Sequence, residues 1–139
     1  MNIGRIVKMA VAGAVAYLVV DYVVLNYVLA GAMASMTSIM NPAVPSMAMW
    51  MLVDVVAAIL FAVVFDRVGT SFGSGWMGGA VFGGYVGVMF GVPTWIGLQL
   101  YLKDVSYSNA WLFIASTVVD YVAMGAAAGA AGGDETAKA

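Results

Sequence analysis

The chain has 139 residues, of which 64% are hydrophobic and 9% are charged, whereas a soluble domain is about half apolar and about a quarter charged. Five Lys and Arg against seven Asp and Glu give a formal net charge of −2, which excludes a basic surface for nucleic acid. Cys and His are absent, so disulfides, thiolate metal sites and histidine catalysis are excluded as well. The composition predicts an integral membrane protein that has the lipid bilayer as a partner.

Long uncharged segments predict how often the chain crosses the bilayer. No charged residue occurs from Tyr22 to Val53 or from Val68 to Leu102, and a spanning helix needs about 20 mostly apolar residues. The predicted spans, in chain order, are 8–33, 46–66, 75–101 and 109–131. The predicted fold class is therefore all-α: a polytopic membrane protein with four transmembrane helices in a compact bundle, which forms a single domain over residues 1–139.

The basic residues favour one orientation in the membrane, because Lys and Arg mark the cytoplasmic side. Arg5 and Lys8 precede or begin the first span, Arg67 separates the second from the third, and Lys138 follows the fourth. Lys103 alone falls on the opposite side. We therefore predict that both termini are cytoplasmic and that the protein resides, as a multi-pass protein, in a membrane of the bacterial inner-membrane type.

Glycine recurs at every fourth position of the third span. The row consists of Gly75, Gly79, Gly83, Gly87 and Gly91. A row of this kind leaves a groove without side chains, into which another helix backbone can pack closely. Two arrangements are open at this stage: the groove packs within the bundle, or part of it faces a second copy of the chain or another membrane protein.

Acidic residues occur near the centres of three spans. They are Asp21 in the first span, Asp54 in the second and Asp120 in the fourth. A charged side chain at this depth costs about 2.5–3.5 kcal/mol on the insertion scale, and such groups usually face the bundle interior. Protonation, a shared cation, or a basic group from another chain would each relieve the cost. The structural alternative is that neutral carboxyls bind neighbouring helices through hydrogen bonds.

Other polar residues lie near these acids in the sequence. Tyr17 precedes Asp21 by one turn and Ser116 precedes Asp120 by one turn, so each is a possible hydrogen-bond partner on the same helix face. We interpret both as supporting groups of the carboxyl site.

A second feature is predicted in the third span. Pro93 removes a backbone donor and should kink the helix, and Trp95 and Gln99 follow it. These residues, with Asn26 at a similar depth on the first span, could line the mouth of a cavity. The alternative is a kink filled by a packed Trp95.

A short repeat accompanies these features, because Val-Val-Asp-Tyr-Val occurs at 19–23 and again at 118–122.

The second half of the chain, from Gly79 to Gly91, through Val92-Pro93 and on to Met124-Gly125, resembles small four-helix bacterial membrane families that are classed as domains of unknown function. The resemblance implies a four-span fold and supplies no site.

The sequence favours a transport function over catalysis. No nucleophile has a base beside it, and no phosphate-binding or dinucleotide-binding motif is present, so we expect no enzyme, no cofactor and no metal centre. The acids predict a proton- or cation-linked transporter or channel for a small solute. The alternative is that the chain is a non-catalytic accessory or assembly subunit of a larger membrane protein complex.

Overall fold

The computed structural model describes residues 2–36, 47–103 and 105–133. The described residues contain helices and connecting turns, and four of the helical segments are long and apolar enough to cross a membrane, as the sequence predicts. In chain order, the elements are α1 (Ile3–Val23), the π-helical turn η1 (Val24–Val28), α2 (Ala30–Ser35), α3 (Met47–Val68), the 3-10 turn η2 (Gly69–Phe72), α4 (Gly75–Tyr101) and α5 (Tyr107–Gly132).

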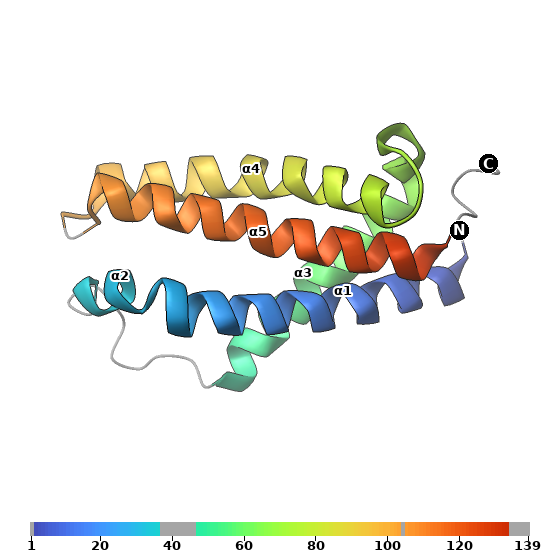
Figure 1. Cartoon of the computed structure of the whole chain (residues 1–139), viewed down its shortest axis with the longest axis horizontal. Coiled ribbons are helices and arrows are strands. Elements are labelled where there is room, and N and C mark those ends of the chain that lie inside the picture. The colour runs from blue at the N-terminus through green and yellow to red at the C-terminus, as the bar shows by residue number, and fades with distance from the viewer. Residues whose placement is uncertain (1, 37–46, 104, 134–139) are drawn as a thin grey trace.

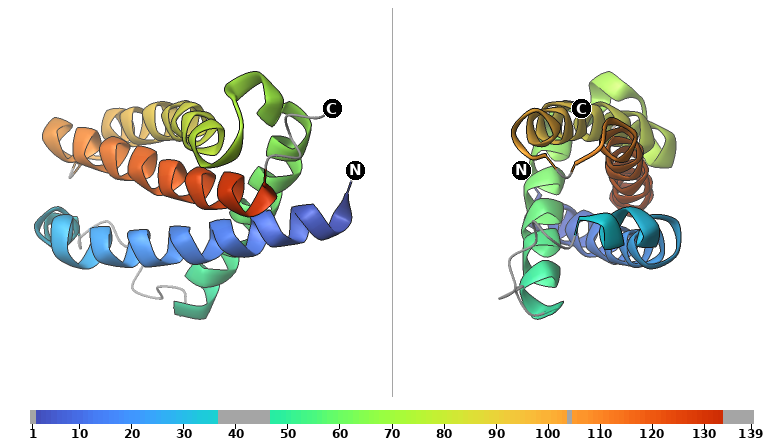
Figure 2. Two further views of the ribbon diagram at one scale, coloured as in Figure 1. Left: turned by 45° about the vertical axis from the view of Figure 1, so that its right-hand side comes forward. Right: turned by 90° about the vertical axis from the view of Figure 1, so that its left-hand side faces the viewer.

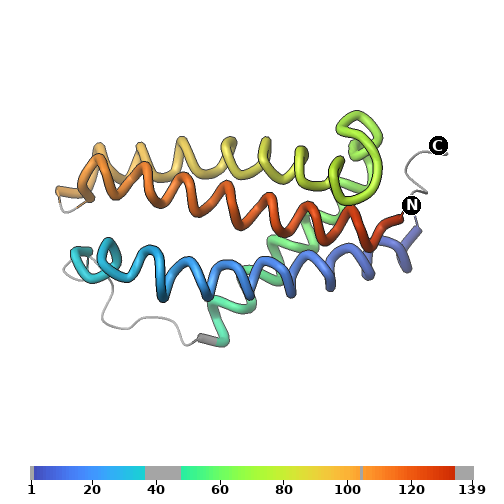
Figure 3. Tube along the Cα trace, in the orientation of Figure 1, coloured from blue at the N-terminus to red at the C-terminus, as the bar shows by residue number. Residues whose placement is uncertain are grey.

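The bundle is built on the antiparallel pair of α4 and α5 (Figure 1). Helix α1 lies along α5, and α3 crosses α1 at a steep angle (Figures 1 and 2). The start of α1 and the end of α5 lie at the same end of the molecule, as the tube trace also shows (Figure 3). The Arg5 guanidinium at this end forms an ion pair with the Asp66 carboxylate near the end of α3.

The first span differs from the single helix predicted over 8–33. It begins at Ile3, and its winding widens into η1 after Val23, where the Leu29 amide donates to the Val24 carbonyl at 2.8 Å. The Asn26 side-chain amide donates to the Tyr22 carbonyl at 2.8 Å. In an α-helix that carbonyl would accept from the backbone of Asn26, so the side chain competes for the same acceptor and favours the wider turn.

The glycine row of α4 faces α5 of the same chain. A Cβ atom at Gly79 would collide with the Gly125 carbonyl, and one at Gly83 would collide with the Tyr121 carbonyl. The contact becomes looser along the row, because a Cβ at Gly91 would lie 3.3 Å from the Thr117 Cβ. Helix α5 therefore fills this groove, which is the first of the two arrangements considered above.

Two apolar clusters fill the bundle on either side of its middle. The cluster nearer the start of α1 consists of Ile6, Met9, Ala10, Ala14, Ala58, Phe61, Ala62, Phe65, Phe82, Met124 and Ala128. The cluster nearer α2 consists of Leu29, Met36, Val105, Ala110 and Phe113. Along α1 and α5, Asp21 and Asp120 fall between the segments that supply these two clusters.

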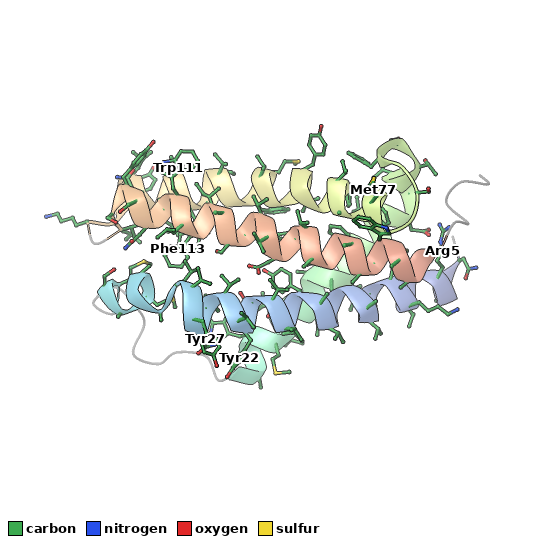
Figure 4. All side chains as sticks on the ribbon, viewed as in Figure 1. Arg5, Tyr22, Tyr27, Met77, Trp111 and Phe113 are labelled. Carbon is green, nitrogen blue, oxygen red and sulfur yellow. The ribbon has the colours of Figure 1, made fainter. Side chains whose placement is uncertain are left out.

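The outer surface is apolar, as a lipid-facing surface requires. Val7, Val11, Val15 and Val19 form an exposed row along α1. Tyr22 and Tyr27 point away from the bundle, and Arg5 lies at its end (Figure 4).

Candidate functional site

The structure brings the three predicted acidic residues into one region of the bundle, each from a different helix. Asp120 of α5 is 4% exposed and Asp54 of α3 is 8% exposed, while Asp21 of α1 is half-buried. The charges of Asp21 and Asp54 both act on Asp120, and the charge of Asp21 acts on Asp54. The three carboxyls therefore lie near enough to one another to interact electrostatically.

Asp120 is the deepest member of this group. Its Oδ1 atom is fully buried and has no hydrogen-bond partner within the described part of the chain. A buried polar oxygen normally has a partner, and leaving one unpaired costs about 1–3 kcal/mol. Among the described residues, the groups whose charges act on Asp120 are the carboxyls of Asp21 and Asp54.

Two tyrosines line the same region. The rings of Tyr17 on α1 and Tyr121 on α5 meet edge to face, with centroids 5.7 Å apart and an interplanar angle of 78°. Both tyrosines lie near enough to the carboxyls for electrostatic interaction. Tyr17 was predicted as a supporting residue and lies beside the acids.

The sequence analysis did not select Tyr121 for the site. The available signal was the repeat, in which Tyr121 follows Asp120 as Tyr22 follows Asp21. The two tyrosines nevertheless differ in environment, because Tyr22 is 53% exposed on the outer face whereas Tyr121 packs against Tyr17 and lies 6.4 Å from Phe61 between ring centroids.

Within the described residues, no hydrogen bond joins a carboxyl of the site to any of the predicted supporting residues, which are Tyr17, Ser116, Asn26 and Gln99. The Ser116 hydroxyl donates to the Phe113 carbonyl of its own helix at 2.8 Å. Asn26 donates to the Tyr22 carbonyl. Gln99 is half-buried on α4, one turn beyond Trp95.

Of the predicted Pro93 and Trp95 feature, Trp95 lies at the interface of α4 and α5. Helix α4 continues through Pro93, whose side chain is exposed. The Trp95 ring stacks on Phe113, with centroids 4.1 Å apart and an interplanar angle of 14°. The Trp95 indole Nε1 donates to the Thr117 hydroxyl at 3.3 Å. Trp95 is thus packed against Phe113 and Thr117 of α5, which is the packing alternative given above.

The arrangement of the acids bears on which ions they can hold. Among the residues that the structure describes, no three acidic side chains are placed so that they could hold one metal ion. Divalent cations require several oxygen ligands around a single centre.

Comparisons with family models, with curated proteins and with solved structures find no match to this chain. The function must therefore be argued from the site itself.

Proposed function

We propose that the protein moves protons, coupled to a small solute, across the membrane through the carboxyls of Asp21, Asp54 and Asp120. The observation that carries the proposal is the buried, unpartnered Oδ1 of Asp120, which lies in a region where the other charges are also acidic. A proton neutralises such a group without requiring a cavity or a ligand shell. Uptake and release at this depth would carry charge through the bundle, and intramembrane carboxyls of this kind mark proton relays.

The orientation that accompanies this proposal places the start of α1 and the end of α5 in the cytoplasm. Arg5 and Lys8 lie at that end of the bundle, with Arg67 in the last turn of α3. Lys and Arg accumulate on the cytoplasmic side of membrane proteins. The bacterial inner membrane remains the proposed location.

The test is proton flux into liposomes that contain the purified protein and an internal pH-sensitive dye. A potassium diffusion potential supplies the driving force. We expect the wild type to acidify the lumen faster than protein-free liposomes, and we expect Asp120→Asn to abolish the difference. Asp66→Asn is the matched control, since it makes the same change to an acid that is paired with Arg5 at the bundle end.

The proposal fails if the wild type conducts no more protons than empty liposomes, or if Asp120→Asn conducts as well as the wild type. The flux must also be measured with and without sodium inside, at a constant potassium gradient. A flux that follows the metal cation rather than pH would assign a cation to the site in place of the proton.

The second candidate is a non-catalytic accessory or assembly subunit. The first half of α3 favours this candidate, because the successive residues 49–53 are all exposed and could contact a partner helix. The same helix enters the bundle core only from Ala58 onward. Purification from native membranes in a mild detergent tests this candidate. Stoichiometric partner chains would support it, and recovery of the chain alone or as a homo-oligomer would contradict it.

A further inference from the structure

We infer that the hydroxyl of Tyr17 is the group through which protons pass between the three carboxyls, so that Tyr17 is a relay residue of the site and not merely a neighbour of Asp21. This inference rests on the proposed function. It adds a role for one side chain and a route between acids that belong to three different helices.

The position of Tyr17 places it between the helices that supply the acids. It precedes Asp21 by four residues on α1, so the two side chains share one helix face. Its ring packs edge to face on Tyr121, the residue that follows Asp120 on α5. Tyr17 also packs against the apolar cluster to which α3 contributes Ala58, Phe61, Ala62 and Phe65. The side chain therefore spans the junction of α1, α3 and α5.

The chemistry of the site requires a group of this type. Within the described residues, no hydrogen bond joins the three carboxyls to one another, and Asp120 Oδ1 is unpaired. An ionised carboxylate only accepts hydrogen bonds, whereas a phenolic hydroxyl both donates and accepts. A transfer through Tyr17 is balanced: its oxygen accepts the proton of one carboxylic acid while its own proton passes to another carboxylate. One O–H bond breaks and one forms at the phenol, which is neutral before and after.

The other hydroxyls near the site are less suitable for this role. Tyr121 directly follows Asp120 on α5, and adjacent residues of a helix do not share a face. The Ser116 hydroxyl already donates to the Phe113 carbonyl. Tyr22, although adjacent to Asp21, lies on the exposed outer face.

The test compares Tyr17→Phe with Tyr22→Phe, which removes one hydroxyl from the same helix on the outer face. Tyr17→Phe keeps the ring that packs on Tyr121, so the fold is retained. The first readout is the infrared C=O stretching band of protonated carboxyls. A band that disappears in Asp120→Asn is assigned to the carboxyl site. We expect Tyr17→Phe to shift this band and Tyr22→Phe to leave it unchanged.

The second readout is proton flux, which should fall by at least about tenfold in Tyr17→Phe if the hydroxyl relays protons. An unshifted carboxyl band in Tyr17→Phe overturns the inference, and so does the absence of any protonated-carboxyl band in the wild type across the pH range where the protein is folded. These infrared results are obtained whether or not the protein transports. If the band shifts but wild-type liposomes carry no protons, the proposed transport is wrong. If Tyr17→Phe conducts protons as fast as the wild type, the relay role is wrong and the transport proposal stands.

Discussion

Gly83→Ala is expected to separate the two helices on which the acidic site is built. A Cβ atom at Gly83 would collide with the Tyr121 carbonyl oxygen, and it would lie 2.8 Å from the carbonyl carbon and 3.1 Å from the Val122 Cα. Carbon atoms in favourable contact are about 3.5–4.0 Å apart. All three atoms belong to the α5 backbone, which cannot rotate aside as a side chain can, so α4 and α5 must move apart.

The expected magnitude follows from two opposing effects. Forcing an extra carbon into a packed interface costs about 1–3 kcal/mol, and the rigid backbone places Gly83→Ala toward the upper end of that range. Replacing Gly by Ala within a helix recovers about 1 kcal/mol. We therefore expect a net loss of about 1–2 kcal/mol in the free energy of unfolding. The neighbouring Gly84→Ala is the matched control, because its Cβ would meet only the Val122 Cγ2 at 3.6 Å, an ordinary contact.

The assay is reversible unfolding of the purified variants in mixed micelles, followed by circular dichroism. Gly84→Ala should be as stable as the wild type or slightly more stable. Gly83→Ala should also alter the carboxyl infrared band, because the backbone that it displaces carries Tyr121 next to Asp120. A Gly83→Ala variant at least as stable as Gly84→Ala would refute the packing argument.

Three further predictions concern other parts of the chain. Arg5→Ala should lower the free energy of unfolding by more than the value of about 1 kcal/mol typical of an exposed ion pair, because the side chain of Asp66 is only 5% exposed. An unchanged unfolding midpoint in the same assay would contradict this prediction. Trp95→Phe keeps a ring for stacking but loses the indole donor, so it should cost about 1 kcal/mol in the same unfolding assay, and a neutral result would show that the hydrogen bond contributes nothing. Since the sequence contains no Cys, a single introduced Cys is the sole thiol in each variant and its labelling reports the accessibility of that position. In intact cells, a membrane-impermeant thiol reagent should label Lys103→Cys and not Lys8→Cys. Labelling of both variants from one side would contradict the orientation.

The number of spans and most of their limits could be predicted because they depend on local composition. An uncharged segment of sufficient length forms a helix in lipid whatever surrounds it, since its backbone groups have no other partner there. The third span, predicted at 75–101, coincides with α4 (Gly75–Tyr101). The π-helical turn could not be predicted, because it depends on whether the Asn26 side chain or its backbone takes the Tyr22 carbonyl.

The carboxyl site was predictable only in part. The depth of each Asp follows from its place in a span, and the cost of exposing it to lipid favours an inward position. The tyrosines show where this reasoning ends. Tyr22 and Tyr121 occupy the same place in the repeat, yet one is exposed and the other packs on Tyr17. Their difference depends on how each helix is rotated against its neighbours, which a repeat of five residues does not encode.

The acids lie between two kinds of helix packing, and this bears on how the site can work. Asp120 belongs to α5, which is held to α4 by direct backbone contact at Gly79 and Gly83. Helix α1 meets α5 less closely: a Cβ at Gly13 would lie 3.1 Å from the Met124 Cγ and 3.4 Å from the Met124 carbonyl oxygen, and the methionine side chain adapts its conformation readily. A backbone contact has one close-packed arrangement, whereas a side-chain contact can repack. Movement that changes the distance between Asp120 and Asp21 is therefore easier between α1 and the α4–α5 pair than within that pair, and Tyr17 lies at that same junction.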